Sequence, residues 1–230
     1  MSISEKLTTI AENEQKVYEA GAKSAEYDFW NQFQTDCAGK GYKYAFSGYG
    51  WSEVNFKPIM DIVLKNGAEC VFYNTHMFPL KDMLEKNGVK FDTSKMTNMD
   101  RVFNYAMMGT NERHIIPPVG NDNVISAVNC FGVATGVRII EKFTCSPTCA
   151  GLNNAFFRCD SLESVTFGNT IATNLVLNFS TKLTHECLLH ILGQLEETST
   201  TLTLTLGATN LAKLTDAEKA IATEKGWTLA

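Results

Sequence analysis

Short β-like runs recur along this chain at a nearly constant interval, and this recurrence constrains the fold more than any other feature. Their starts lie about 24 to 26 residues apart, with one longer gap before the fifth, and the runs are Val89–Phe91, Ile115–Ile116, Ile139–Ile140, Val165–Phe167, Leu202–Leu206 and Trp227–Leu229. A unit of this length, one strand plus a turn or short helix, cannot bury its own apolar face. The period therefore predicts units that stack on one another and share a continuous core.

A phenylalanine precedes several of these strands in the same phase. The residues in question are Phe103, Phe131, Phe157 and Phe179. Because two independent periodicities agree, we expect each ring to fill one layer of the shared core.

The C-terminal segment has the features of a terminal unit, which a stack needs to cover its last apolar face and strand edge. Thr201–Leu206 alternates polar and apolar residues, as a half-buried strand does. Thr215 and Glu218 then form the capping-box pattern of a helix that ends at Gly226. We expect Trp227–Leu229 to be the last strand.

The N-terminal segment predicts a long helix, from residue 2 to about 36, opened by a capping-box pattern at Ser2 and Glu5. We accordingly divide the chain into a helical segment, 1–38, and a stack of repeats with terminal caps, 39–230. Four apolar residues of the helix have heptad spacing: Ile3, Leu7, Ile10 and Val17. They predict either a short interface for self-association, three-stranded as in fibre-like proteins, or a contact with the stack.

A family resemblance rests on the segment Asn154–Phe167, which carries the pattern A-F-x-x-C-x-x-L-x-x-V-x-F. This segment resembles the BspA-type leucine-rich repeat, and Phe91–Met99, continuing to Phe103, is similar to a variant of the same repeat. The resemblance covers the chain from about Val89 to Leu195. It implies an α/β repeat fold, a leucine-rich-repeat solenoid that follows the long N-terminal helix.

The ends of the chain, Met1–Tyr18 and Leu202–Ala230, also look similar to those of phage- and prophage-encoded repeat proteins from gut Firmicutes. This likeness implies a virion-associated protein, linked to the tail, with adhesion to cell surfaces as the usual theme. It supplies no catalytic residues.

Composition argues against two classes of partner. The formal net charge is -5 and the lysines and arginines are scattered, so the chain lacks the basic stripe that binds nucleic acid. The sequence has neither a secretory signal pattern nor about 18 consecutive apolar residues, so we expect no membrane insertion. Such a protein is made in the bacterial cytoplasm and reaches the outside in the virion or after lysis.

Catalytic and metal-binding patterns are weak throughout. The seven cysteines are spread too widely along the chain for a disulfide framework. Four of them lie near one another in sequence but lack the tight C-x-x-C spacing of a zinc site: Cys130, Cys145, Cys149 and Cys159. His185 and His190 are five apart and fall on different faces of a helix that Thr184 would cap. No G-x-S-x-G elbow is present. We expect no metal, no cofactor and no enzymatic activity.

The predicted recognition surface follows from the strand pattern. If Leu162, Val165 and Phe167 point into the stack, Glu163, Ser164 and Thr166 point out of it. The neighbouring units would add further exposed residues in adjoining rows, among them Ile115 and Ile139. The proposed ligand-binding residues are Arg113, His114, Arg138, Glu141, Glu163 and Thr166. This mixed surface suits a specific contact with a host-cell surface protein or glycan. An intracellular interaction scaffold and a virion component without a receptor role remain alternatives.

Overall fold

The computed structural model describes residues 72, 80–86, 92–107 and 114–230 of the 230-residue chain. The chain divides between Gly41 and Tyr42, and all described residues belong to the second unit. The predicted helix of residues 1–38, with Ile3, Leu7, Ile10 and Val17, therefore lies outside the described residues, as does the candidate strand Val89–Phe91.

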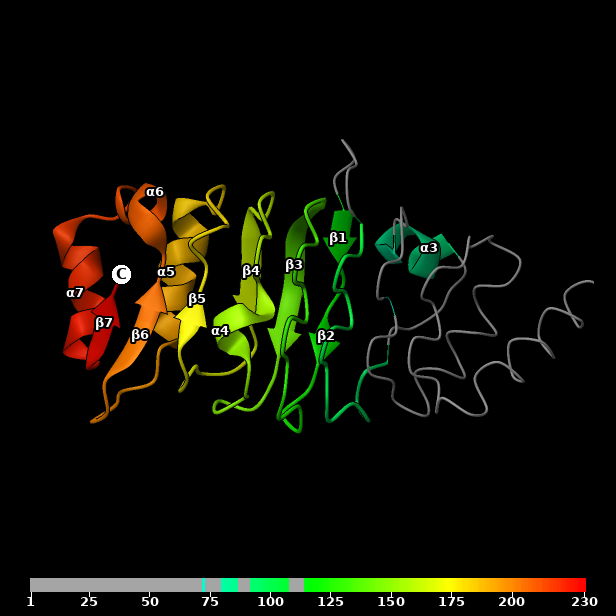
Figure 1. Ribbon diagram of the computed structural model, residues 1–230, viewed down its shortest axis with the longest axis horizontal. Helices are drawn as coiled ribbons and strands as arrows, with labels where there is room; N and C mark the ends of the chain where they lie inside the picture. Colours follow the sequence, from blue (N-terminus) through cyan, green and yellow to red (C-terminus); the bar gives the residue numbers. More distant parts are fainter. Residues whose placement is uncertain (1–71, 73–79, 87–91, 108–113) are drawn as a thin grey trace, which may run out of the picture. The chain divides into compact units, whose positions relative to one another are not determined.

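The first sheet is parallel and is built around one long strand. β3 (Val137–Thr144) pairs with β1 (His114–Ile116), β2 (Val119–Gly120) and β4 (Ser164–Phe167), and Figure 1 shows β1, β3 and β4 side by side. Its paired residues are about one period apart, as in Ile116 with Ile140 and Ile140 with Val165. The three strands predicted in this region are confirmed. The two-residue strand β2 was missed because it is too short to produce an alternating pattern.

The second sheet is also parallel and has the order β5-β6-β7, with β5 at Leu175–Val176, β6 at Leu202–Thr205 and β7 at Trp227–Leu229. The predicted last two strands are confirmed, and β5 was missed. Helix α5 (His185–Gln194) lies in the chain between β5 and β6. This helix accounts for the longer gap before Leu202.

Helices α5 and α7 (Asp216–Glu224) begin where the sequence places caps. The Thr184 hydroxyl accepts a hydrogen bond from the Cys187 backbone N–H at the start of α5. Thr215 and Glu218 form the predicted capping box of α7. The other helices among the described residues are short: α3 (Leu80–Lys86), α4 (Leu152–Ala155) and α6 (Gly207–Leu211).

The core follows the repeat-like pattern of Asn154–Phe167 position by position. Each apolar position of that pattern is buried: Ala155, Phe156, Cys159, Leu162, Val165 and Phe167. The Phe156 ring stacks on Phe131, and Phe131 stacks on Phe103, with ring centroids 5.4 Å apart in both cases. A fourth ring, Phe72, stacks on Phe103 at 5.2 Å. The predictions for Phe103 and Phe131 are therefore confirmed.

The predictions that Phe157 and Phe179 are core residues are wrong. Their exposed fractions are 43% and 38%, and their rings contact each other edge to face at 5.0 Å. The buried ring of this turn is Phe156, one residue earlier. In the following turn Leu177 takes the place of Phe156. The two residues accept the same hydrogen bond: the Leu177 carbonyl accepts from the Ser180 N–H, and the Phe156 carbonyl accepts from the Cys159 N–H.

The outer edge of β4 is covered by side chains of α5 and not by another strand. The Val165 backbone N–H donates to Cys187 Sγ at 3.3 Å, and the Phe167 N–H donates to His190 Nε2 at 3.0 Å. The Thr184 N–H, just before α5, donates to the Glu163 carbonyl at 2.9 Å. These contacts satisfy backbone groups that a further parallel strand would otherwise pair.

Candidate functional site

The outward side of β3 and β4 carries the residues that the sequence singled out. Val137, Ile140 and Val165 point inward and are buried, while the side chains between them are half-buried. The predicted inward positions of Val137, Ile140 and Val165 are therefore confirmed, although both residues between Val137 and Ile140 are half-buried, so β3 does not alternate strictly. We call the outward row the sheet strip and define it as Ile115, Arg138, Ile139, Glu141, Glu163, Ser164 and Thr166.

Two ion pairs hold the charged side chains of the sheet strip. Arg138 Nη1 lies 2.6 Å from Glu163 Oε1, and the Glu163 backbone N–H also donates to the Arg138 carbonyl. Lys81 of α3 donates to Glu141 Oε1 at 2.5 Å. Half-exposed pairs of this kind contribute only about 0.2–1 kcal/mol to stability. Their main effect is to fix the orientation of the charges. Sequence reasoning missed Lys81, which lies 60 residues from Glu141.

The placement of His114 on the exposed surface is wrong. His114 pairs with the inward residue Val137, and only 2% of the residue is exposed. The register between β1 and β3 shifts after His114, so that Ile115 lies beside the outward Ile139. Successive side chains of a strand face opposite sides, so His114 faces inward because Ile115 faces out. Arg113 lies outside the described residues.

The described cysteines are all unpaired and buried, as small core residues are. Burial raises the pKa of the Cys130, Cys159 and Cys187 thiols. A hydrogen bond between the side chains of Cys145 and Cys149 raises the pKa of the first and lowers that of the second. Among the described residues no group of three or more histidines, cysteines or carboxylates is arranged to hold a metal ion.

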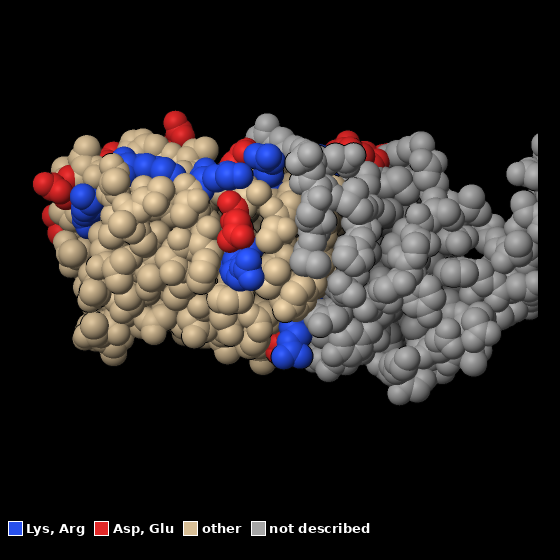
Figure 2. All heavy atoms as spheres, turned by 45° about the horizontal axis from the view of Figure 1, so that its top comes forward, with Lys and Arg blue, Asp and Glu red and all other residues tan. Residues whose placement is uncertain are grey.

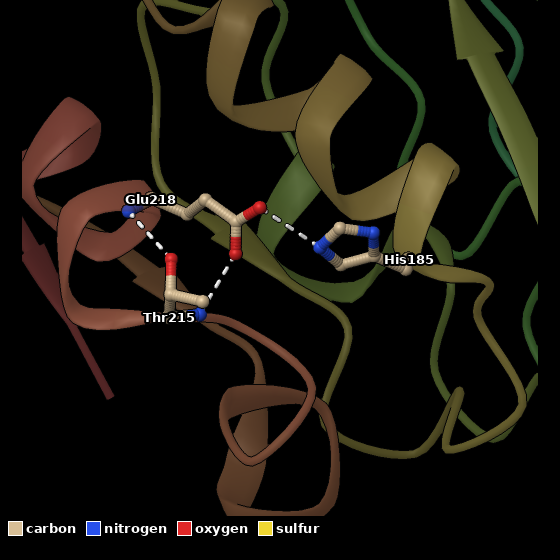
Figure 3. A network of polar contacts seen from close by, with 3 residues as sticks. All are labelled: His185, Thr215 and Glu218. Atoms are coloured by element: carbon tan, nitrogen blue, oxygen red, sulfur yellow. Dashed lines mark hydrogen bonds and ion pairs between the residues drawn. The ribbon is translucent and has the colours of Figure 1, made fainter.

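The histidine at the start of α5 contacts an acid on α7, and Figure 3 shows this network. His185 Nε2 lies 2.9 Å from Glu218 Oε1, while Glu218 Oε2 accepts a hydrogen bond from the Thr215 backbone N–H at 2.7 Å. The Thr215 amide is the main reason that the pKa of Glu218 lies below its ordinary value. The carboxylate is thus part of a helix cap and of a helix-to-helix contact.

Surface charge is unevenly placed on the described part of the chain. Figure 2 shows that the lysines and arginines on the visible face gather mainly along its upper edge, beside acidic side chains, and that most of the remaining surface is uncharged. Within the described helices, none has the length and apolar character needed to cross a bilayer.

Comparison of the chain with family models, curated proteins and solved structures found no match.

Proposed function

We propose that this chain is a BspA-type leucine-rich-repeat solenoid that acts as a non-enzymatic recognition protein. In this proposal it is encoded by a phage or prophage, is linked to the tail or the particle surface, and binds a host-cell protein or glycan through the sheet strip. The repeat-like pattern of Asn154–Phe167, whose apolar positions are all buried, supports the fold assignment.

The observation that carries the functional proposal is the parallel pairing of β3 with β4. It sets Ile139 beside Ser164 and Arg138 beside Glu163, so polar, charged and apolar groups form regular rows. Because Arg138, Glu163 and Glu141 are already held by ion pairs, they lose little conformational freedom when a ligand binds. A preordered mixed surface of this kind favours specific recognition.

The test uses fluorescently labelled protein and a panel of gut Firmicutes strains, with cell binding measured by flow cytometry. We expect the wild-type protein to bind at least one strain, and the variant Arg138→Ala/Glu141→Ala to bind that strain at least tenfold more weakly. Because each ion pair contributes no more than about 1 kcal/mol, the variant should stay folded, which its melting curve would verify.

A matched control removes one cation and one anion elsewhere. Asp216 and Lys219 form a pair on α7, with 3.3 Å between the charged atoms, so Asp216→Ala/Lys219→Ala makes the same change in charge. The control variant should bind like the wild type. Absence of binding to every strain, or equal binding by both variants, would contradict the proposal.

A further inference from the structure

Two thiols meet beneath the exposed turn that follows β3. Cys145 is the first residue after this strand, and Cys149 closes the turn, since its backbone N–H donates to the Ser146 carbonyl at 2.9 Å. A hydrogen bond also joins the two cysteine side chains. Cys145 and Cys149 are 5% and 0% exposed, whereas Thr148 between them is exposed. We call this pair of cysteines the turn dithiol.

The backbone holds the two cysteines at about the separation of a disulfide. A turn closed by this hydrogen bond keeps the Cα atoms of its first and fourth residues within about 7 Å, and Cys145 directly precedes the first. A disulfide typically spans about 4.4–6.8 Å between Cα atoms. Because the two side chains already contact each other, a small movement of the turn brings the sulfurs to bonding distance.

The turn is also held by the units on both sides of it. The Ser146 N–H donates to the Val124 carbonyl at 2.9 Å, and the Pro147 carbonyl accepts from the Ala172 N–H at 2.8 Å. Pro147 itself restricts the turn, because its ring fixes the backbone angle φ. The turn dithiol therefore has one arrangement in the folded chain, which favours one particular disulfide over exchange among several cysteines.

The two sulfurs differ in acidity and therefore in reactivity. The hydrogen bond from the Cys145 side chain lowers the pKa of Cys149, and the same bond raises the pKa of Cys145. By contrast, burial is the main cause of the raised pKa values of Cys130, Cys159 and Cys187. Since the thiolate is the reactive form of a cysteine, Cys149 is the first of the described thiols to react with an oxidant.

We infer that Cys145 and Cys149 form a disulfide when the protein meets hydrogen peroxide, and that this bond locks the turn after β3. The Cys149 thiolate attacks one oxygen of the peroxide, so that an S–O bond forms, the O–O bond breaks, and the second oxygen leaves as hydroxide and takes up a proton. The Cys145 sulfur then attacks the sulfenic acid of Cys149. The S–S bond forms as the S–O bond breaks, and a second water leaves. Two thiols are thus oxidised while one peroxide is reduced to two waters.

Hydrogen peroxide is little larger than a water molecule, so it can reach thiols beneath an exposed turn from which burial excludes bulkier oxidants. The inference goes beyond recognition and does not depend on what the chain binds. Its test can therefore fail while the proposed function stands, and the reverse is also true.

Peptide mass spectrometry tests the inference on the full-length protein. Trypsin cuts after Lys142 and Arg158 and releases both cysteines in one peptide, 143–158, which contains no third. The protein is treated with hydrogen peroxide, its remaining thiols are alkylated with iodoacetamide, and it is then digested. We expect this peptide to be unalkylated and lighter by two hydrogen atoms, and we expect dithiothreitol to restore both alkylation sites.

Thermal unfolding measures the lock itself. Closing so short a loop should raise the Tm of the oxidised protein by about 4–8 °C relative to the same sample after dithiothreitol. The comparison within one sample is needed because peroxide also oxidises methionines, and dithiothreitol does not reverse that change.

Two single variants separate the roles of the two sulfurs. Cys145→Ser keeps a donor for Cys149 but removes the second thiol, so peroxide should leave a sulfenic acid at Cys149 that dimedone labels. Cys149→Ala leaves only the less acidic Cys145, and its labelling should be at least fivefold weaker. Equal labelling of the two variants would contradict the order of the two steps.

The matched control is Cys130→Ala, because Cys130 lies close enough to both cysteines for their charges to interact. The disulfide within peptide 143–158 should form in this variant as in the wild type. The inference is overturned if both cysteines of that peptide remain open to alkylation, or if peroxide instead joins it to peptide 114–138, which carries Cys130. A Tm that is unchanged or lower after oxidation also overturns it.

Discussion

Replacing Phe156 by alanine should destabilise the protein far more than the same change at its neighbour Phe157. Phe156 is buried and contacts three rings, with centroid distances of 5.4 Å to Phe131, 6.1 Å to Phe143 and 5.9 Å to Phe167. Deleting a buried phenylalanine costs about 3–5 kcal/mol, and each lost ring pair contributes about 0.5–1.5 kcal/mol beyond its area. Phe156→Ala should therefore reach the upper part of that range, about 4–5 kcal/mol.

Phe157→Ala is the matched control for this prediction. Phe157 is 43% exposed and has one ring contact, with Phe179, so its removal should cost about 1 kcal/mol. Urea unfolding followed by far-UV circular dichroism measures the difference. With a slope of about 2–3 kcal/mol per molar urea, Phe156→Ala should lower the midpoint by about 1.5–2 M and Phe157→Ala by less than about 0.5 M. Equal shifts, or a larger one for Phe157→Ala, would refute the assignment of the core.

Three further predictions concern the helices and the C-terminal end. His190→Leu leaves the Phe167 N–H without its acceptor and should lower the free energy of unfolding in urea by about 1–3 kcal/mol. His190→Gln can restore an acceptor and should lower it by less. Equal losses for the two variants would contradict the role of the imidazole. The pKa of Glu218 is lowered in the folded state from its ordinary value near 4.5, so its stabilising effect is present at neutral pH and is lost as the pH falls through the folded-state pKa. The difference in Tm between wild type and Glu218→Gln should therefore shrink from pH 7 to about pH 3, and a constant difference would argue against it. Ending the chain after Leu195 removes β6 and β7. This truncation should lower the Tm by about 10 °C or more, or make the protein insoluble. A soluble product with an unchanged Tm would count against stacked units.

The sequence predicted the strands and caps well because these depend on local patterns. The alternation in Val165–Phe167 and the capping box of Thr215 and Glu218 are determined by residues within one turn of each other, and both are present in the structure. The strands β2 and β5 have two residues each, too few for a period to be recognised.

The phenylalanine periodicity failed where two such residues are adjacent. Phe156 and Phe157 are equally apolar, and only stacking against Phe131 decides which ring is buried. His114 was misplaced because the prediction set it on the same face as its neighbour Ile115, whereas successive side chains of a strand face opposite sides. Contacts between distant segments, such as Lys81 with Glu141, carry no local signal in the sequence.

The covered edge of β4 also affects how the chain avoids polymerisation. An open edge of a parallel sheet offers a template on which the same strand of another molecule can add, and repetition of that step produces fibres. Here Cys187 and His190 occupy the two backbone donors that such an incoming strand would need. Growth of the first sheet beyond β4 requires displacement of α5, and the buried helix residues Leu188, Ile191 and Leu192 oppose that displacement. Cys187→Ala would free the Val165 N–H and so open one of the two positions at which a further strand can add, which makes a single buried sulfur part of what keeps the molecules separate.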